Sequence, residues 1–196
     1  GLSLLYAALK DAPLSTFLGF LGLGVLAIIA AITYTAGKKP YGYVGLGDLS
    51  VFIFFGWVGV LGSFYLHTLV WDPLLLLPAT SCGLFAVAVL NVNNIRDIES
   101  DRLTGKNSIP VRIGRKNAVT YHWIILSVAM IAAIAYALVT QSSAAGYLFL
   151  LSFPLIFRNG LAVKNLMNPR ELDPYLKQMA LSTLLFVILF GIGTIL

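Results

Sequence analysis

Charged residues are scarce in this sequence. Only 11% of its 196 residues are Asp, Glu, Lys or Arg, while 59% are hydrophobic. A soluble domain usually has about a quarter of its residues charged, and the polar residues here are too few to cover the surface of one. The hydrophobic residues also form long uncharged runs, which is typical of helices that face lipid. These proportions exclude an ordinary soluble domain and indicate a polytopic membrane protein.

Cysteine is nearly absent as well, since Cys82 is the only one. A single cysteine excludes a disulfide framework and a cysteine-rich metal site, and in an apolar stretch it indicates packing. No basic segment precedes a short apolar run, so the sequence shows no signal peptide. The chain starts at Gly1 without a methionine, and we interpret it as the C-terminal part of a longer protein.

The apolar runs predict six membrane spans in an all-α transmembrane bundle. Each run is close to the roughly 20 residues that a helix needs to cross the hydrocarbon core. Arg158 interrupts the fifth run, which makes it the weakest. Residues 1–196 are expected to form a single transmembrane domain. The predicted spans are Ser15–Ala36, Leu49–Leu66, Pro73–Val92, Ala118–Val139, Ala144–Val163 and Met179–Leu196.

The basic residues are distributed unevenly between the two sides that these spans define. The loops 37–48, 93–117 and 158–178 share one side, and only Lys10 of the 13 Lys and Arg residues lies on the other. Basic loops remain in the cytoplasm, so this side is predicted to be cytoplasmic. The net charge of +5 therefore reflects membrane topology and requires no nucleic-acid partner.

The third span leads into three oxygen-bearing side chains spaced by four residues, Asn93, Asp97 and Asp101. If the helix continues beyond the span, all three lie on one face. Their donors are hard oxygens, with no His or Cys nearby, which favours Mg²⁺ over zinc or a redox metal. The alternative is a helix end whose charges only mark the membrane interface.

Basic residues around this motif are the ones expected to bind an anion. Mg²⁺ usually completes its shell with water and substrate phosphate, and Lys and Arg can hold the phosphate oxygens. The sequence thus predicts a diphosphate site. Its candidate diphosphate-binding residues are Lys38, Lys39, Arg102, Lys106 and Arg112, with Arg115 and Lys116 close by.

The loop between the first two spans contains the candidate substrate-binding residues Tyr34 and Asp48. Its tyrosines and lysines could bind an aromatic, anionic substrate, or they could form an interfacial aromatic belt. Asp48 precedes a span, so helix capping is an alternative for it.

Glycines and histidines in the spans are interpreted as structural. Small residues allow close helix approach, which predicts packing faces at Gly19, Gly22, Gly56, Gly59 and Gly62. His67 and His122 lie at predicted span ends without paired ligands, which favours interfacial structure over catalysis.

The aspartate motif resembles the second aspartate-rich motif of the UbiA superfamily of membrane prenyltransferases. Residues 34–63 (YTAGKKPYGYVGLGDLSVFIFFGWVGVLGS) and 77–114 (LPATSCGLFAVAVLNVNNIRDIESDRLTGKNSIPVRIG) are similar to the 1,4-dihydroxy-2-naphthoate polyprenyltransferases of menaquinone synthesis. This resemblance implies nine helices around a cavity that opens to the cytoplasm, with two aspartate motifs that bind Mg²⁺ on the prenyl diphosphate. The six spans here match the last six family helices.

The resemblance also implies a reaction and a role for each residue. A polyprenyl group passes from polyprenyl diphosphate to 1,4-dihydroxy-2-naphthoate, with loss of CO₂ and diphosphate, giving demethylmenaquinone at a bacterial inner membrane. Asn93, Asp97 and Asp101 hold Mg²⁺, the two aspartates are catalytic, and Tyr34 lies near the diphosphate with Lys38 or Lys39. The first family motif, of the type N-D-x-x-D, is not in this chain, so we expect the chain alone to be inactive.

Three other functions remain as alternatives. One is a prenyltransferase for a different aromatic acceptor. A CDP-alcohol phosphotransferase also has aspartates four apart, but it requires an upstream D-x-x-D-G-x-x-A-R, which is missing, and Asn93 stands where it has glycine. A transporter usually has ionisable residues near the middle of the membrane, whereas the interiors of these spans are uncharged.

Overall fold

The computed structural model describes residues 1–37 and 40–196. Lys38 and Lys39, two of the predicted diphosphate-binding residues, lie outside the described residues. Regular structure in the described ranges is entirely helical. Its elements are α1 (Leu2–Leu9), α2 (Leu14–Thr35), η1 (Tyr41–Val44), α3 (Gly47–Val51), η2 (Phe52–Leu61), α4 (Gly62–Thr68), η3 (Pro73–Leu75), α5 (Leu76–Arg96), α6 (Ile98–Leu103), α7 (Ile109–Val139), η4 (Ala144–Ser152), α8 (Phe153–Asn165) and α9 (Pro169–Ile195).

Six helical stretches are long and apolar enough to cross a membrane, which confirms the predicted all-α bundle and the number of spans. The chain is therefore an integral membrane protein. Two starts were predicted too late, because the sixth stretch begins at Pro169 and a helical segment from Ile109 precedes the fourth, with a kink at Gly114 (φ 76°, ψ 159°) between the two. In both cases the charged residues ahead of the apolar run are also helical. Proline near each helix start suits the first turn, where its missing N–H has no partner to lose.

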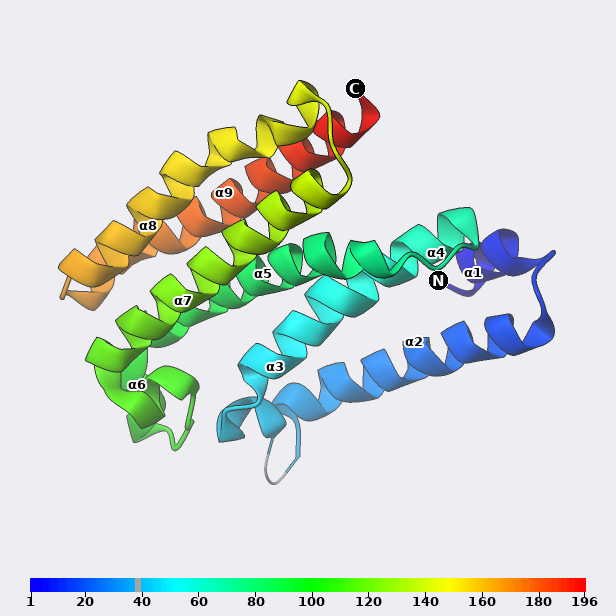
Figure 1. Cartoon of the computed structure of the whole chain (residues 1–196). Helices are drawn as coiled ribbons and strands as arrows, with labels where there is room; N and C mark the ends of the chain where they lie inside the picture. Colours follow the sequence, from blue (N-terminus) through cyan, green and yellow to red (C-terminus); the bar gives the residue numbers. More distant parts are fainter. Residues whose placement is uncertain (38–39) are drawn as a thin grey trace.

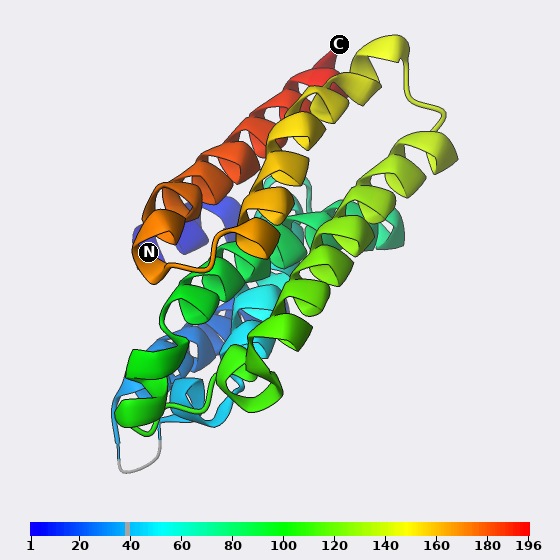
Figure 2. The ribbon, with the colours of Figure 1, turned by 90° about the vertical axis from the view of Figure 1, so that its left-hand side faces the viewer.

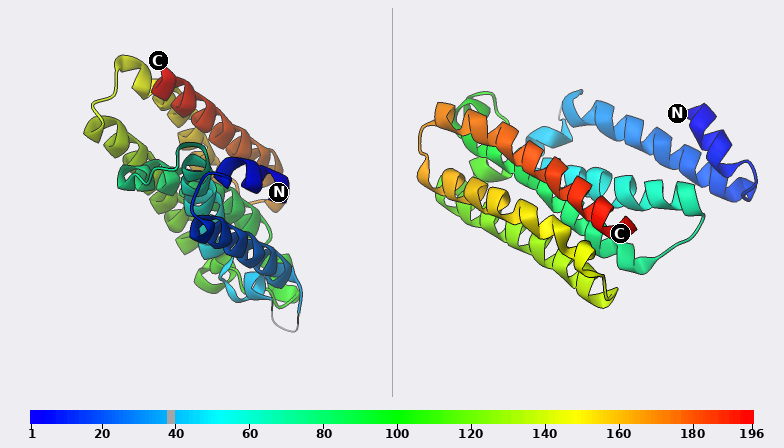
Figure 3. Two further views of the ribbon diagram at one scale, coloured as in Figure 1. Left: turned by 90° about the vertical axis from the view of Figure 1, so that its right-hand side faces the viewer. Right: turned by 90° about the horizontal axis from the view of Figure 1, so that it is seen from above.

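Helices α5, α7, α8 and α9 run side by side and form the compact part of the bundle (Figure 1). Helix α5 is central, because it packs against α7, α9 and the η2 segment. Helix α2 lies apart from this group and contains no buried residue. Its backbone neighbours are α1, which folds back beside its start in the view from above (Figure 3), and η1, and its Phe20 ring stacks on Tyr65 of α4. Helix α1 also contacts α4.

The connections between spans alternate between the two ends of the bundle. The turn after α2, helix α6 and the α8–α9 turn lie at one end, and the turns after α1, α4 and α7 lie at the other (Figures 1 and 2). The sequence places its basic loops at the first end. The geometry thus agrees with the alternation on which the six-span prediction rests.

Glycine allows α5 to approach η2 closely. A Cβ atom built on Gly83 of α5 would lie 2.8 Å from the carbonyl oxygen of Phe52, and one on Gly56 would lie 2.8 Å from the Cα of Gly83. The packing prediction is therefore confirmed at Gly56. At Gly19 and Gly22, no atom of the described residues lies within 4 Å of such a Cβ, so packing there stays a prediction. Gly83 belongs to the contact although the sequence pattern did not indicate it.

A chain of buried polar side chains joins four helices in the core. His122 on α7 receives a hydrogen bond from Asn91 Nδ2 of α5 (3.3 Å) and contacts Asn159 Oδ1 of α8 through Nε2 (3.2 Å). Asn159 Nδ2 then donates to Gln178 Oε1 of α9 (2.6 Å), and Gln178 Nε2 donates to Ser182 Oγ (2.9 Å). His122 is fully buried between the helices, which supports its predicted structural role. Its position at the membrane interface stays a prediction.

Replacing His122 with leucine is expected to weaken this four-helix contact. Asn91 Nδ2 would keep only a 3.4 Å contact with the carbonyl of Ala118, and Asn159 Oδ1 would lose its donor. Lost side-chain hydrogen bonds in membrane proteins cost about 0.6–1.7 kcal/mol each, so the free energy of unfolding should fall by about 1–3 kcal/mol. Unfolding by SDS in mixed micelles measures it.

His67→Leu is the matched control, because the exposed ring of His67 contacts only the Ser63 carbonyl of its own helix among the described residues. Equal unfolding free energies for the two variants would show that the buried chain does not stabilise the bundle.

Candidate active site

The three motif residues lie where α5 gives way to α6. Helix α5 ends at Arg96, and Asp97 has φ −96° and ψ 10°, outside regular helical geometry. The backbone hydrogen bonds Asp97 N to Asn93 O (3.0 Å) and Asp101 N to Asp97 O (2.8 Å) nevertheless continue across the junction. The predicted uninterrupted helix is therefore wrong at Asp97, although the four-residue spacing along the backbone is kept.

Arg96 joins the first two motif residues. Its Nη2 donates to Asn93 Oδ1 (2.8 Å) and to Asp97 Oδ2 (2.9 Å), while its Nε donates to Asp97 Oδ1 (2.8 Å). Such a two-pronged contact between guanidinium and carboxylate is among the stronger ion pairs in proteins. The remaining nitrogen, Nη1, donates to Asp173 Oδ1 of α9 (2.8 Å). One guanidinium thus links the end of α5 to the start of α9.

The third motif residue has a different cation. Asp101 is buried, and its Oδ2 lies 2.8 Å from Lys106 Nζ. Ser108 Oγ donates to the same oxygen (3.4 Å), and Lys106 also donates to Asn94 Oδ1 (3.2 Å). In the structure, then, the motif is divided into an Asn93–Asp97 pair held by Arg96 and an Asp101 held by Lys106.

The donor oxygens of the first pair suit a hard divalent cation. Asn93 Oδ1 and Asp97 Oδ2 both lie within 2.9 Å of a single positively charged atom, Arg96 Nη2. Among the described residues, no group of three or more His, Cys, Asp or Glu side chains gathers as metal ligands. Mg²⁺ commonly takes one or two carboxylates and fills its shell with water and substrate phosphate, so a two-oxygen protein contribution fits it.

The candidate substrate residues Tyr34 and Asp48 lie near each other at the same end of the bundle. Asp48 is buried and accepts a hydrogen bond from the Tyr121 hydroxyl (2.9 Å). It lies within the first turn of α3, whose N-cap is Leu46, so the capping alternative is wrong. A Cβ on the neighbouring Gly47 would lie 3.1 Å from the hydroxyl oxygen of Tyr34. Tyr121 was missed in the sequence because nothing in its spacing links it to Asp48.

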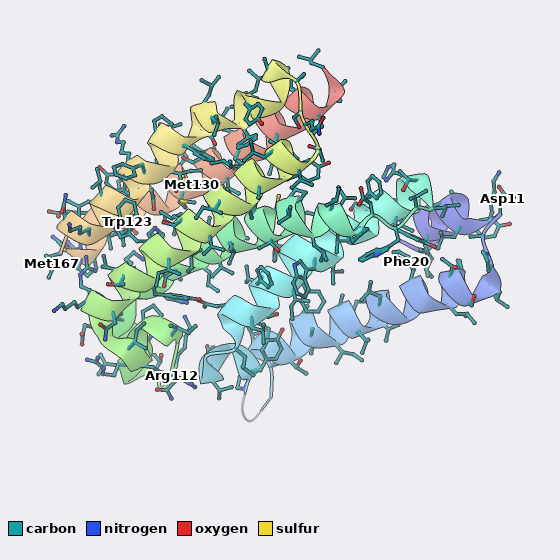
Figure 4. The ribbon with its side chains drawn as sticks, in the orientation of Figure 1. Asp11, Phe20, Arg112, Trp123, Met130 and Met167 are labelled. Atoms are coloured by element: carbon teal, nitrogen blue, oxygen red, sulfur yellow. The ribbon has the colours of Figure 1, made fainter. Side chains whose placement is uncertain are left out.

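Two predicted phosphate ligands, Arg102 and Arg112, contact other groups of the chain and not a motif aspartate. Arg102 lies 3.3 Å from Glu99 Oε2 on the exposed side of α6. Arg112, labelled in Figure 4, donates to the carbonyls of Asn107 (3.0 Å) and Val44 (2.5 Å) and so fastens the start of α7 to the η1 turn. Arg115 similarly donates to the carbonyls of Val163 and Leu166 at the end of α8. In this structure, Lys106 is the predicted phosphate ligand that contacts a motif aspartate.

Arg96 and Asp173, like Tyr121, are residues of the candidate site to which sequence reasoning gave no role in it. Arg96 was counted only as a topological charge, and Asp173 lies 77 positions from its partner. The available signal was the place of Arg96 within the motif, three residues after Asn93 and one before Asp97. Residues three apart on a helix are neighbours, which indicates the Asn93 contact but not the one with α9.

One groove is bordered by these groups, and a second lies away from them against the first half of α2. A polar groove of about 500 Å³ is bordered by Arg96, Asp97 and Asp173. An almost wholly apolar groove of about 480 Å³ lies between α2 and the η2–α4 segment. Phe20 and Trp57 line the second groove, and Figure 4 shows Phe20 pointing from α2 toward α4. The chain therefore has one place suited to charged groups and one suited to a hydrocarbon chain.

Comparison with known proteins gives a consistent family. Residues 1–184 match the UbiA prenyltransferase family. The chain is 51% identical over 180 residues to a 1,4-dihydroxy-2-naphthoate octaprenyltransferase of Haemophilus influenzae and 50% identical over 182 residues to one of Escherichia coli. A protein of the same name from Mycobacterium tuberculosis is 35% identical over 184 residues. No solved structure matches the chain.

These relatives are longer than the chain. The alignments with the Haemophilus and Escherichia proteins cover 92% of this chain and 58% of each relative, and the mycobacterial alignment covers 94% and 60%. The chain therefore spans a little under two thirds of the length of the proteins that it matches.

Proposed function

Because this chain belongs to the UbiA prenyltransferase family, we propose that its site serves the transfer of a polyprenyl group from polyprenyl diphosphate to 1,4-dihydroxy-2-naphthoate. The products are CO₂, diphosphate and demethylmenaquinol, the reduced form of demethylmenaquinone. The observation that carries the proposal is the identity of about half of all aligned residues with two proteins named for that reaction. The convergence of Asn93 and Asp97 oxygens on one positive charge supports a cation site on the diphosphate.

Mg²⁺ is the proposed cofactor, held by Asn93, Asp97 and Asp101. When bound, it neutralises charge that develops on the departing diphosphate. Asn93 and Asp97 are already directed at a common point, whereas Asp101 must exchange Lys106 for the metal. Released from Asp101, the Lys106 ammonium becomes available to a phosphate oxygen.

The remaining residues of the chain bind and orient the two substrates in this proposal. The apolar groove beside α2 supports a prenyl donor, since burying a hydrocarbon chain there removes apolar surface from water. Asp48 and Tyr121 form a fixed polar pair, and together with Tyr34 they are the groups that we assign to substrate binding. The three basic loops direct the site toward the cytoplasm.

The test of this function is an assay with and without metal. Membranes from cells that express the natural gene product receive radiolabelled polyprenyl diphosphate and 1,4-dihydroxy-2-naphthoate. We expect a labelled prenylated product in the presence of Mg²⁺ and its loss when EDTA is added. Without a divalent cation, the negative charge of the leaving diphosphate is not neutralised beside the anionic carboxylates.

Two results would separate the parts of the proposal. Transfer that persists in EDTA would contradict the role of a divalent metal. Labelled product from 4-hydroxybenzoate, with none from the naphthoate, would assign the reaction to another aromatic acceptor while leaving prenyl transfer intact.

A further inference from the structure

Arg96 makes contacts that a metal ion would have to replace. Its Nη2 touches Asn93 Oδ1 and Asp97 Oδ2, and its Nε touches the second oxygen of Asp97. These are the oxygens that the proposed Mg²⁺ site requires. A guanidinium and a divalent cation repel each other at such distances, so each weakens the hold of these two side chains on the other.

We propose that Arg96 is a positioning residue that occupies the cation site of the metal-free protein and gives it up when metal binds. This inference rests on the proposed function, because it concerns the same metal. Arg96 keeps Asn93 and Asp97 directed at one point and neutralises the half-buried Asp97 carboxylate. It does so at the cost of weaker metal binding.

The structure provides a place for the displaced guanidinium. Nη1 of Arg96 is already 2.8 Å from Asp173 Oδ1 at the start of α9, and the Asp173 side chain is 59% exposed. The polar groove of about 500 Å³ is bordered by both residues. Arg96 can therefore release Asn93 and Asp97 by turning into this groove while it stays paired with Asp173.

The second half of the motif has the same arrangement. Lys106 holds Asp101 in the absence of metal, at 2.8 Å. Each motif aspartate is thus neutralised by a cation of the chain itself, and arrival of metal with diphosphate exchanges both pairs. The carboxylates pass to the metal, and Arg96 and Lys106 become available to phosphate oxygens, for which guanidinium and ammonium groups are common ligands.

The inference is tested by measuring metal affinity without any substrate. Mn²⁺ alone is titrated into the purified, metal-free natural gene product, and free Mn²⁺ is followed by electron paramagnetic resonance. Arg96→Gln should bind Mn²⁺ at least about tenfold more tightly than the wild type, because several charge-assisted hydrogen bonds no longer compete with the metal.

Arg170→Gln is the matched control. Arg170 borders the same groove, and its guanidinium donates to neither Asn93 nor Asp97 within the described ranges. Its replacement removes one positive charge nearby without vacating the site, so the Mn²⁺ affinity should stay within about twofold of the wild type.

Arg96→Lys keeps the positive charge and serves if the glutamine variant does not fold. A lysine ammonium cannot bridge three partners as the planar guanidinium does. This variant should bind Mn²⁺ about threefold more tightly than the wild type, between the wild type and Arg96→Gln.

Two outcomes overturn the inference in distinguishable ways. Mn²⁺ affinities of Arg96→Gln and Arg96→Lys equal to or below that of Arg170→Gln would show that Arg96 does not compete with the metal, while the metal site itself stands. An absence of Mn²⁺ binding in the wild type and in every variant would overturn both this inference and the proposed metal dependence.

Discussion

Replacing Asp97 with asparagine is expected to reduce prenyl transfer by about two orders of magnitude or more, the size of effect seen when one group that stabilises transition-state charge is removed. Asparagine keeps the shape of the side chain but not its charge. It therefore weakens the hold on a cation without leaving a cavity. The rate of labelled quinone formation at saturating Mg²⁺ measures the effect.

Glu99→Gln is the appropriate comparison for Asp97→Asn. Glu99 lies two residues further along, its side chain is 79% exposed, and it contacts Arg102 at 3.3 Å. Neutralising it changes the local charge by the same amount, and we expect transfer within about twofold of the wild type because exposed ion pairs contribute little. Full activity in Asp97→Asn, or equal losses in both variants, would remove Asp97 from the site.

Replacing Gly83 with valine is expected to have the largest effect on the fold. A Cβ at this position would lie 2.8 Å from the Phe52 carbonyl oxygen and 3.0 Å from the Cα of Gly56. Both are backbone atoms, which cannot move aside as the end of a flexible side chain can. Overpacking of this kind costs about 1–3 kcal/mol and sometimes more, and it should lower the thermal unfolding temperature in detergent.

Gly22→Val provides the control for Gly83→Val. Gly22 also lies in a membrane-spanning helix, but within residues 1–37 and 40–196 no atom is within 4 Å of a Cβ built there, so its replacement should leave the unfolding temperature almost unchanged. If Gly83→Val were as stable as Gly22→Val, the close approach of α5 and η2 would not be required. Since α5 ends in the motif, Gly83→Val should also reduce prenyl transfer.

The fold could be predicted from the sequence in its number of spans but not in their starts. Length and hydropathy are sufficient to count spans, because lipid requires about 20 apolar residues in each. They are insufficient to place Ile109 and Pro169, because helical structure extends into charged segments where hydropathy carries no signal. The segment from Ile109 joins the span through a kink at Gly114, and the start of α9 has Pro169 in its first turn and Asn168 as its cap.

The sequence predicts which side chains could supply oxygen atoms to a cation, but it does not predict which side chains contact those oxygens in the fold. The spacing of Asn93, Asp97 and Asp101 is a local property of one short stretch of sequence, so it can be read from the sequence alone. The contact between Arg96 and Asp173 is not local, since it depends on how α9 packs beside α5. The same limit applies to Asp48 and Tyr121, which are 73 positions apart.

The η2 segment (Phe52–Leu61) is wound more widely than an α-helix, as a π-helix with hydrogen bonds to the fifth preceding residue. It contains Phe52 and Gly56, which contact Gly83, and its first residues connect them to α3, which bears Asp48. Loss of one residue from Trp57–Leu61 leaves the relative direction of Gly56 and Asp48 unchanged. Loss of one from Phe52–Phe55, a change that hydropathy would not register, turns Asp48 relative to Gly56 by the rotation of one residue, which is about 100° in an α-helix and smaller in the wider π-helix. The helical register between Asp48 and Gly56, more than the apolar character of the segment, therefore determines whether Asp48 faces Tyr121.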